Sequence, residues 1–266
     1  MAEYEEPLYD TIGKSYTVTR KADTRITTRV IDLLGLPIGS LIADIGAGTG
    51  NYSNALADRG YRVVAIEPSS VMRAQSSPHP MVRWISGTAE SIPLQNNAVY
   101  GVVVILAIHH FRSAREAALE FRRICPGGPV VILTYDPRLG RGFWFHEYFP
   151  GIYRREFERF PPIEEVAATL AVDVWKPEVR EFMLPHDLSD KNMHSGWNRP
   201  EVYLDEQMRN NTSGFAGSAE ADARQGLSRL KEDLQSGAWD ARHGHLREQN
   251  ALNTGFVFLK LASNSE

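Results

Sequence analysis

The chain has 266 residues, of which 42% are hydrophobic and 23% are charged, and its formal net charge is −4. This length and composition predict a globular protein with one sizeable core and exclude a disordered chain. The negative net charge argues against a broad binding surface for nucleic acid. The single cysteine, Cys125, excludes an internal disulfide, a cysteine-built metal site and chemistry that needs two thiols.

The first ten residues, MAEYEEPLYD, are acidic, whereas a signal peptide would begin with basic and then apolar residues. No window of the sequence reaches the ~18 to 20 apolar residues of a membrane-spanning helix. With the lone cysteine, which fits a reducing compartment, these features lead us to expect a cytoplasmic protein without a membrane span.

Strand-like and helix-like patterns alternate along the first half of the chain. Short apolar runs have the character of parallel strands buried on both faces, at 41–46, 62–67, 82–87, 101–106 and 130–135. Helical patterns separate most of them, with Ser70 and Ser113 as expected caps and Gly60 as a stop. This alternation predicts a doubly wound α/β sheet with a ligand crevice at the carboxyl ends of its strands.

The pattern changes after Tyr135. Residues 136–170 are rich in aromatic side chains, and most of the chain beyond them has a helical pattern. Only 179–184 and 255–262 look like further strands, which we expect to form an antiparallel edge of the sheet.

Three glycines follow the first expected strand, in the stretch ADIGAGTGN. A strand that ends in an acid and is followed by glycines and a helix N-terminus is typical of a nucleotide-binding turn. Gly46, Gly48 and Gly50 occupy positions one, three and five, whereas a dinucleotide fingerprint has glycines at one, three and six. Asp44 would repel a pyrophosphate and would suit a cation. A ligand with an ammonium and a sulfonium but no phosphate fits this turn.

Residues 41–53 resemble motif I of the class I S-adenosylmethionine-dependent methyltransferases. Four further stretches resemble later motifs of this family in the same order, at 63–72, 86–94, 101–111 and 121–132. The resemblance covers residues 9–135, about half of the chain. The most similar subgroup is the type-11 small-molecule set, which includes ubiquinone and menaquinone biosynthesis methyltransferases, and the segment YDTIGKSY at 9–16 also resembles it.

The resemblance implies a Rossmann-like doubly wound sheet, mostly parallel with an antiparallel last strand, plus a helical substrate cap. We therefore divide the chain into a cofactor-binding core over 1–135 with a lid segment at 1–22, an aromatic-rich cap insertion over 136–178, and a remainder over 179–266 with the last strands and C-terminal helices. The implied cofactor is S-adenosylmethionine, and the product is S-adenosylhomocysteine.

The resemblance also assigns cofactor contacts residue by residue. Glu67 is expected to hold both ribose hydroxyls, and Thr88, Ala89 and Glu90 belong to the loop on the adenine side. Met72 either packs its helix or covers the adenine. Tyr100 and Thr88 stand where the family usually has acids, so the adenine contacts stay open. The full set of expected cofactor-binding residues is Asp44, Gly46, Ala47, Gly48, Gly50, Glu67, Pro68, Thr88, Ala89, Glu90, Leu106 and Tyr16.

Methyl transfer requires alignment of a nucleophile with the methyl carbon and exclusion of water, and it requires no metal. If the nucleophile carries a proton, an imidazole is a natural acceptor near neutral pH. His110 is our candidate for the base or for orienting the acceptor, and His109 is the next. The alternative is that the two histidines only hold the loop by hydrogen bonds.

The aromatic segment after Tyr135 is the expected substrate cap. Its rings either line a wall for an apolar or aromatic acceptor or form the hydrophobic core of a helical lobe. The candidate substrate residues are Phe145, His146, Tyr148, Trp197 and His186. We expect a small acceptor that is methylated at oxygen or nitrogen, and carbon stays open.

Several other activities can be weighed against these residues. The chain lacks the cysteines of an arsenic methyltransferase, a placed thiol for cytosine-5 methylation and an Asn-Pro-Pro-Tyr motif. The alternatives left open are a methyltransferase of tRNA or another nucleic acid, a NAD-dependent oxidoreductase, and a cofactor-binding but inactive partner subunit. We expect a small-molecule acceptor, no nucleic-acid partner, and a monomer or homodimer.

Overall fold

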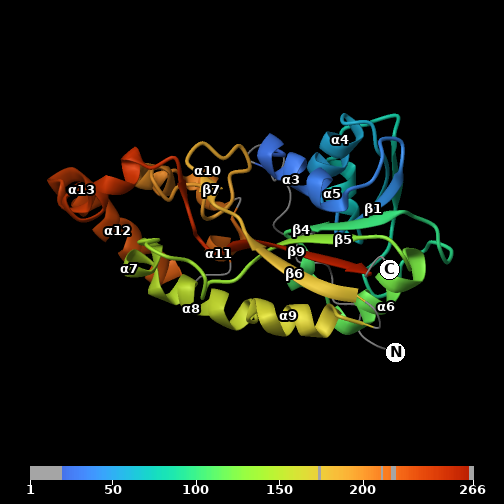
Figure 1. Ribbon diagram of the computed structural model, residues 1–266. Coiled ribbons are helices and arrows are strands. Elements are labelled where there is room, and N and C mark those ends of the chain that lie inside the picture. The colour runs from blue at the N-terminus through green and yellow to red at the C-terminus, as the bar shows by residue number, and fades with distance from the viewer. Residues whose placement is uncertain (1–19, 173–174, 211, 217–219, 264–266) are drawn as a thin grey trace, which may run out of the picture.

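The computed structural model describes residues 20–172, 175–210, 212–216 and 220–263. Tyr16 and nearly all of the expected lid segment 1–22 lie outside these residues. Figure 1 shows a twisted sheet with helices packed on it in one part of the molecule and a helical lobe beside it.

The main sheet has the strand order β3-β2-β1-β4-β5-β9-β6. Its strands are β1 (Leu41–Ile45), β2 (Arg62–Ile66), β3 (Val82–Ile85), β4 (Gly101–Ile105), β5 (Val130–Tyr135), β6 (Trp175–Glu181) and β9 (Phe256–Ser263). The pairs from β3 through β5 are parallel, and β9 is antiparallel to both of its neighbours, β5 and β6. The mostly parallel sheet with an antiparallel last strand is therefore confirmed.

The expected strand at 179–184 is displaced, because β6 begins at Trp175 and ends at Glu181. Its residues WKPEVRE are almost all exposed and include Pro177. Charged side chains and proline are typical of an edge strand, so the apolar pattern that marks the other strands is missing here. The expected boundary at 178/179 thus falls inside β6.

The helices that pack on the sheet begin and end at recognisable residues. They are α3 (Thr24–Leu34), α4 (Asn51–Ala57), α5 (Ser70–Ala74), α6 (Ala114–Ile124) and α9 (Ile163–Leu170). The hydroxyl of Ser113 accepts a hydrogen bond from the Glu116 amide at the start of α6, as the sequence predicts. The cap of α5 is Ser69 and not Ser70, because the Ser69 hydroxyl accepts from the Met72 amide.

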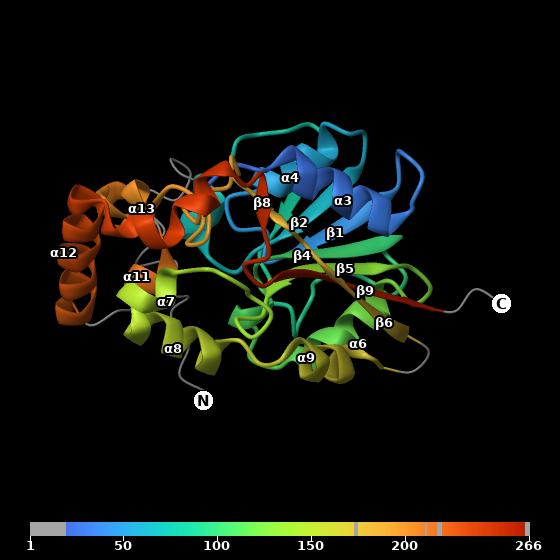
Figure 2. The ribbon, with the colours of Figure 1, turned by 60° about the vertical axis from the view of Figure 1, so that its left-hand side comes forward.

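Two apolar clusters fill the space between the sheet and these helices. On one face, Val103 and Val131 share a cluster with Ile26 of α3 and Leu56 of α4. On the other face, Val102, Ile132 and Leu259 share a second cluster with residues of α6 and α9, and Figure 2 shows these two helices together on that side. The helices therefore cover both faces, as a doubly wound sheet requires.

The lobe is formed by α7 (Phe145–Tyr148), α8 (Pro150–Arg159), β7 (Leu184–Pro185), a 3-10 helix at Pro200–Leu204, α10 (Glu206–Asn210), α11 (Ser213–Ala216), α12 (Glu220–Ser236), α13 (Ala238–His243), a 3-10 helix at Gly244–Glu248 and β8 (Ala251–Leu252). Its centre is aromatic: Trp144, Trp197, Trp239, Tyr203, Phe145 and Phe149 are fully buried. The Trp144 indole donates to the Trp197 carbonyl at 2.7 Å. The lobe thus combines chain from before and after β6.

Within the part of the chain that the structure describes, we find no helix long and apolar enough to cross a membrane.

Candidate active site

The glycine turn after β1 takes the backbone conformation that its sequence predicts. Gly46, Gly48 and Gly50 have φ angles of 71°, 59° and 79°, in the left-handed region that favours glycine. A Cβ on Gly46 would lie 2.6 Å from the Cβ of Ala107, and one on Gly50 would lie 2.5 Å from Cζ2 of Trp84. The turn therefore needs glycine both for its φ angles and for close packing.

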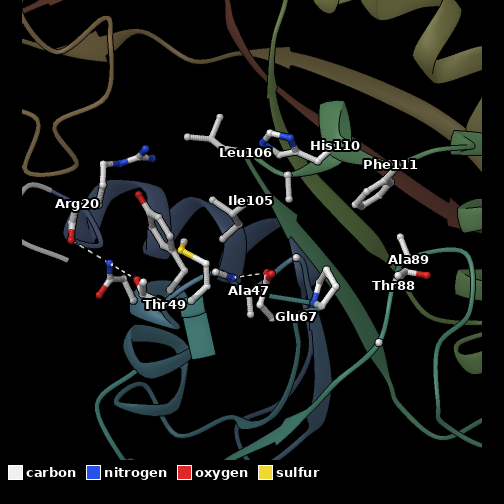
Figure 3. Close-up of a pocket in the computed structure, with 18 of the residues that line it drawn as sticks. Arg20, Ala47, Thr49, Glu67, Thr88, Ala89, Ile105, Leu106, His110 and Phe111 are labelled. Atoms are coloured by element: carbon white, nitrogen blue, oxygen red, sulfur yellow. Dashed lines mark hydrogen bonds between the residues drawn. The ribbon is translucent and has the colours of Figure 1, made fainter. Parts of the chain in front are cut away.

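A cavity of about 350 Å³ opens at this turn, at the carboxyl ends of β1, β2 and β4. Figure 3 shows its wall, with Arg20 at one end, Glu67 in the middle and Thr88 and Ala89 at the other end. Ten of the residues expected at the cofactor or catalytic site line it: Gly46, Ala47, Gly48, Glu67, Pro68, Thr88, Ala89, Glu90, Leu106 and His110. This is the crevice that the strand order predicts.

Glu67 is fixed at the centre of the cavity by two backbone amides. Its Oε2 atom accepts a hydrogen bond from the Gly48 nitrogen at 2.9 Å, and its Oε1 atom accepts one from the Ser69 nitrogen at 2.9 Å. The residue is only 7% exposed. A carboxylate held this rigidly presents its remaining lone pairs to the cavity in one orientation.

Asp44, by contrast, does not line the cavity. It is buried, and its Oδ2 atom accepts a hydrogen bond from the Ser53 hydroxyl at 2.5 Å. Burial raises the pKa of Asp44 to about 6, the Ser53 hydrogen bond opposes this, and the nearby Glu67 adds to it. Asp44 therefore ties the end of β1 to α4, and Gly50, which also lies outside the lining, shapes the same turn.

The chain that follows β4 carries His110 to the cavity, and its first residue, Leu106, has a strained backbone. Leu106 has a φ angle of 52°, which is uncommon for a leucine, and its amide donates to the Leu133 carbonyl at 2.9 Å. A 3-10 helix at Ile108–His110 follows, and the His110 amide donates to the Ala107 carbonyl. Strain of this kind is typical of functional sites.

His110 is an exposed residue that lines the cavity. Arg159 of α8 places its Nη2 atom 3.4 Å from both ring nitrogens. Desolvation in the cleft, together with the Arg159 charge, lowers the pKa of His110 to about 4. His110 is therefore neutral at pH 7, when it can accept a hydrogen bond but is a weak base.

His109 lies away from the cavity. Its ring packs on Phe160, with 4.6 Å between the ring centroids. Its Nδ1 atom is buried and has no hydrogen-bond partner among the described residues. Burial holds the pKa of His109 well below its usual range, so this ring is neutral as well.

The loop expected on the adenine side is tied to the start of α6. The Glu90 Oε1 atom accepts hydrogen bonds from the backbone amides of Arg112 at 2.7 Å and Ser113 at 3.3 Å. Met72 is 2% exposed and also lines the cavity, with its methyl carbon 3.4 Å from where a Cβ on Gly48 would lie. Met72 therefore packs in the core and also borders the cavity, and its contact with the adenine stays a prediction.

The other end of the cavity is formed by residues that were not predicted from the sequence, which include Arg20, Tyr52 and Asp190. Arg20 and Asp190 form a two-pronged ion pair, and the Tyr52 hydroxyl donates to the Asp190 Oδ2 atom at 3.2 Å. No local pattern marks this group, because Tyr52 and Asp190 are 138 residues apart in the sequence.

None of the five candidate substrate residues is among those that line this cavity. Phe145, Tyr148 and Trp197 are buried within the aromatic centre of the lobe. His146 is exposed, with its Nδ1 atom 2.9 Å from the Phe143 carbonyl, and the Nδ1 atom of the half-buried His186 lies 3.2 Å from the Asn250 carbonyl. The lobe's rings thus fit the core interpretation, and its contribution near His110 comes from Arg159 and Phe160.

Comparison with known proteins agrees with this geometry. A family model described as a methyltransferase domain matches residues 43–132. A crystal structure from Anabaena variabilis, described as a candidate methyltransferase of an antibiotic biosynthesis pathway, is 41% identical, with a TM-score of 0.88; the alignment covers 93% of this chain and 99% of that one.

Two sequence relatives are named for quinone substrates. A demethylmenaquinone methyltransferase of Renibacterium salmoninarum is 27% identical over 136 residues, which cover 48% of this chain and 57% of the relative. A 2-phytyl-1,4-naphthoquinone methyltransferase of Thermosynechococcus vestitus is 25% identical over 181 residues, which cover 65% and 79%. The chain thus spans little more than half of the first relative's length.

The Anabaena structure is covered almost end to end, and the family model spans most of the residues that line the cavity. The expected enzyme class and cofactor are therefore confirmed, and the alternative of a NAD-dependent oxidoreductase finds no support. This chain belongs to the class I S-adenosylmethionine-dependent methyltransferases.

Proposed function

We propose that this enzyme methylates a small aromatic molecule that carries an acidic hydroxyl group, at that oxygen or at a ring carbon activated by it. The observation that carries the proposal is the contact between the neutral His110 ring and the guanidinium of Arg159 beside the cavity. The sequence leaves both oxygen and nitrogen open as the methylated atom, and the positive charge of Arg159 disfavours nitrogen.

The residues of the cavity fit the cofactor. The Glu67 carboxylate suits the two ribose hydroxyls, the bare turn at Gly46 and Gly48 leaves space for a close approach, and Thr88 with Ala89 would border the adenine. When bound, S-adenosylmethionine supplies a methyl group that is already activated on a sulfonium. The task of the protein is then to orient the acceptor and to exclude water.

Arg159 and His110 favour an acceptor that is acidic. With a pKa near 4, His110 is a poor proton acceptor for an aliphatic alcohol or an ammonium group. It can accept a hydrogen bond from an acidic hydroxyl and so fix the acceptor oxygen, while the Arg159 charge stabilises the anion that forms when the proton passes to water. A protonated amine would be repelled by the same charge.

Aromatic side chains near this contact support a ring-shaped acceptor. Phe111 lines the cavity, and Phe160 packs against both His109 and Tyr135. The two quinone methyltransferases among the relatives add weight to an aromatic ring.

The test is a panel of acceptors with matched functional groups. Naphthols, hydroxynaphthoquinones in both redox states, anilines, alkylamines and tRNA would each be incubated with the enzyme and S-adenosylmethionine. We expect S-adenosylhomocysteine and a methylated product only with the hydroxyl-bearing aromatic compounds. Turnover confined to amines or to tRNA would contradict the proposal.

A monomeric or homodimeric state and a cytoplasmic location stay predictions.

A further inference from the structure

The end of the cavity farthest from Thr88 and Ala89 carries both a cation and an anion. Arg20 and Asp190 both line the cavity there, and Figure 3 shows Arg20 on the opposite side of Glu67 from Thr88. The Arg20 side chain is 14% exposed, and the Asp190 side chain is 2% exposed. An ion pair this well buried gains little net stability, because desolvation offsets the attraction.

The chemistry of this pair matches one part of the cofactor. The amino-acid end of S-adenosylmethionine carries one ammonium and one carboxylate, so it needs one anionic and one cationic partner. We propose that Asp190 binds the ammonium group and that Arg20 binds the carboxylate, which makes these two residues the receptor for the amino-acid end of the cofactor. This inference rests on the established cofactor and is independent of the proposed acceptor.

The hydrogen-bond capacity of the Asp190 carboxylate allows this role. An ionised carboxylate offers about four lone-pair sites, and here the carboxylate accepts from two nitrogens of Arg20 and from the Tyr52 hydroxyl. The other carboxylates that line the cavity have different positions and partners: Glu67 is held by Gly48 and Ser69, and Glu90 is held by Arg112 and Ser113.

Asp190 reaches the cavity from the lobe side of the molecule. It lies in the segment that follows β7, and this segment is fastened to the start of α3. The Asp23 Oδ2 atom accepts from the Ser189 amide at 3.1 Å and from the Ser189 hydroxyl at 3.2 Å, and Arg25 donates to Asp187 at 2.5 Å. A cofactor held by Arg20 and Asp190 therefore bridges the core and the lobe segment.

The experiment compares two ligands that differ only at the amino-acid end. S-adenosylhomocysteine has this end, whereas 5′-methylthioadenosine keeps the adenosine and the sulfur without it. In calorimetric titration, we expect Asp190→Asn to weaken the binding of S-adenosylhomocysteine by about tenfold to a hundredfold. The affinity for 5′-methylthioadenosine should stay unchanged. The matched control is Asp32→Asn, since Asp32 is an exposed residue of α3 and lies outside the lining; it should leave both affinities unchanged.

Two results of these titrations would overturn the proposal. The first is an unchanged affinity of the Asp190→Asn variant for S-adenosylhomocysteine. The second is an equal loss for both ligands, which would mark Asp190 as a structural residue only. Arg20→Met should repeat the selective loss, because it removes the partner of the carboxylate group.

A measurement on the unaltered enzyme covers the case in which the Asp190 variant does not fold. Amide hydrogen exchange of residues 186–199 should slow when S-adenosylhomocysteine is added and should stay at the rate of the free protein with saturating 5′-methylthioadenosine. Equal protection by the two ligands would overturn the bridging role of Asp190.

Discussion

The Oε2 atom of Glu67 lies 2.9 Å from the backbone nitrogen of Gly48, so the acid at the end of β2 holds the glycine turn that follows β1. One carboxylate thus shapes the cavity and also forms part of its wall. This double role makes Glu67 the most informative position for testing how the cofactor is held.

We predict that Glu67→Ala weakens binding of S-adenosylhomocysteine by about tenfold to a hundredfold, the usual loss for hydrogen bonds to a charged group. Glu67→Gln, which keeps one acceptor oxygen, should lose less. Calorimetric titration measures both variants. The control is Glu116→Ala, an exposed position of α6 outside the cavity lining. An affinity of Glu67→Ala equal to that of the unaltered protein would rule out the ribose contact.

If His110 orients the acceptor as we propose, His110→Ala should slow methyl transfer by about tenfold to a hundredfold. The affinity for S-adenosylhomocysteine should stay nearly constant, because the variant leaves the proposed cofactor contacts intact. Single-turnover rates and titrations separate the two effects. The exposed His245 offers a control variant, His245→Ala, that should change neither quantity. Full activity of His110→Ala would remove this residue from the reaction.

The pH profile of the reaction follows from the same ring. Since the pKa of His110 is lowered to about 4, the ring stays neutral from pH 8 down to pH 6. We predict that the turnover rate has no acid limb from His110 in that interval. An inflection near pH 6.5 that disappears in His110→Asn would show that the ring titrates at its ordinary pKa.

Burial of His194 should make the fold sensitive to acid. Burial lowers the pKa of His194 from 6.5 to about 3, so the unfolded chain binds a proton between these values and the folded chain does not. The free energy of unfolding therefore falls as the pH drops below 6.5. From pH 7 to pH 5 this group alone contributes a loss of about 2 kcal/mol.

The variant His194→Phe isolates that contribution. Its ring would still pack against Tyr135, Phe143 and Phe256, which now surround the imidazole. Urea unfolding at pH 7 and pH 5 should show a loss on acidification that is about 2 kcal/mol smaller than in the unaltered protein. Equal losses in the two proteins would contradict the neutral state of His194.

Gly50→Ala should destabilise the protein although Gly50 does not line the cavity. The φ angle of 79° costs an alanine about 1 to 2 kcal/mol. The added Cβ would also lie 2.5 Å from Trp84. Gly127→Ala is the control, since a Cβ there meets nothing within 4 Å, and it should change the free energy of unfolding by less than about 0.5 kcal/mol. Similar losses for both variants would exclude a special role for the turn.

The strands of the first half of the chain, the glycine turn and the place of Glu67 were predictable because each depends on residues that are close in the sequence. An apolar run, a glycine that needs a positive φ and an acid at a strand end all leave a local pattern. Arg159 and Asp190 leave none. Each reaches the site through packing between the lobe and the core, and neither is adjacent in sequence to a motif.

The aromatic segment after Tyr135 shows a second limit of prediction from sequence. Aromatic rings are frequent in and after this segment, and this pattern predicts Phe145, Tyr148 and Trp197 as acceptor contacts. In the structure these three are buried among other rings of the lobe. Hydrophobicity and spacing predict burial, but they do not distinguish a ring that packs in a core from one that borders a ligand.

The place of β9 in the sheet has a consequence for the order of folding during synthesis. Tyr135 at the end of β5 pairs with Phe256 of β9, and β9 is also the strand with which β6 pairs. While the ribosome is still producing the lobe, the apolar edge of β5 has no partner strand, and β6 has nothing to join. Until residues 256–263 emerge, this edge is open to pairing with other chains, as is typical of an unpaired apolar strand.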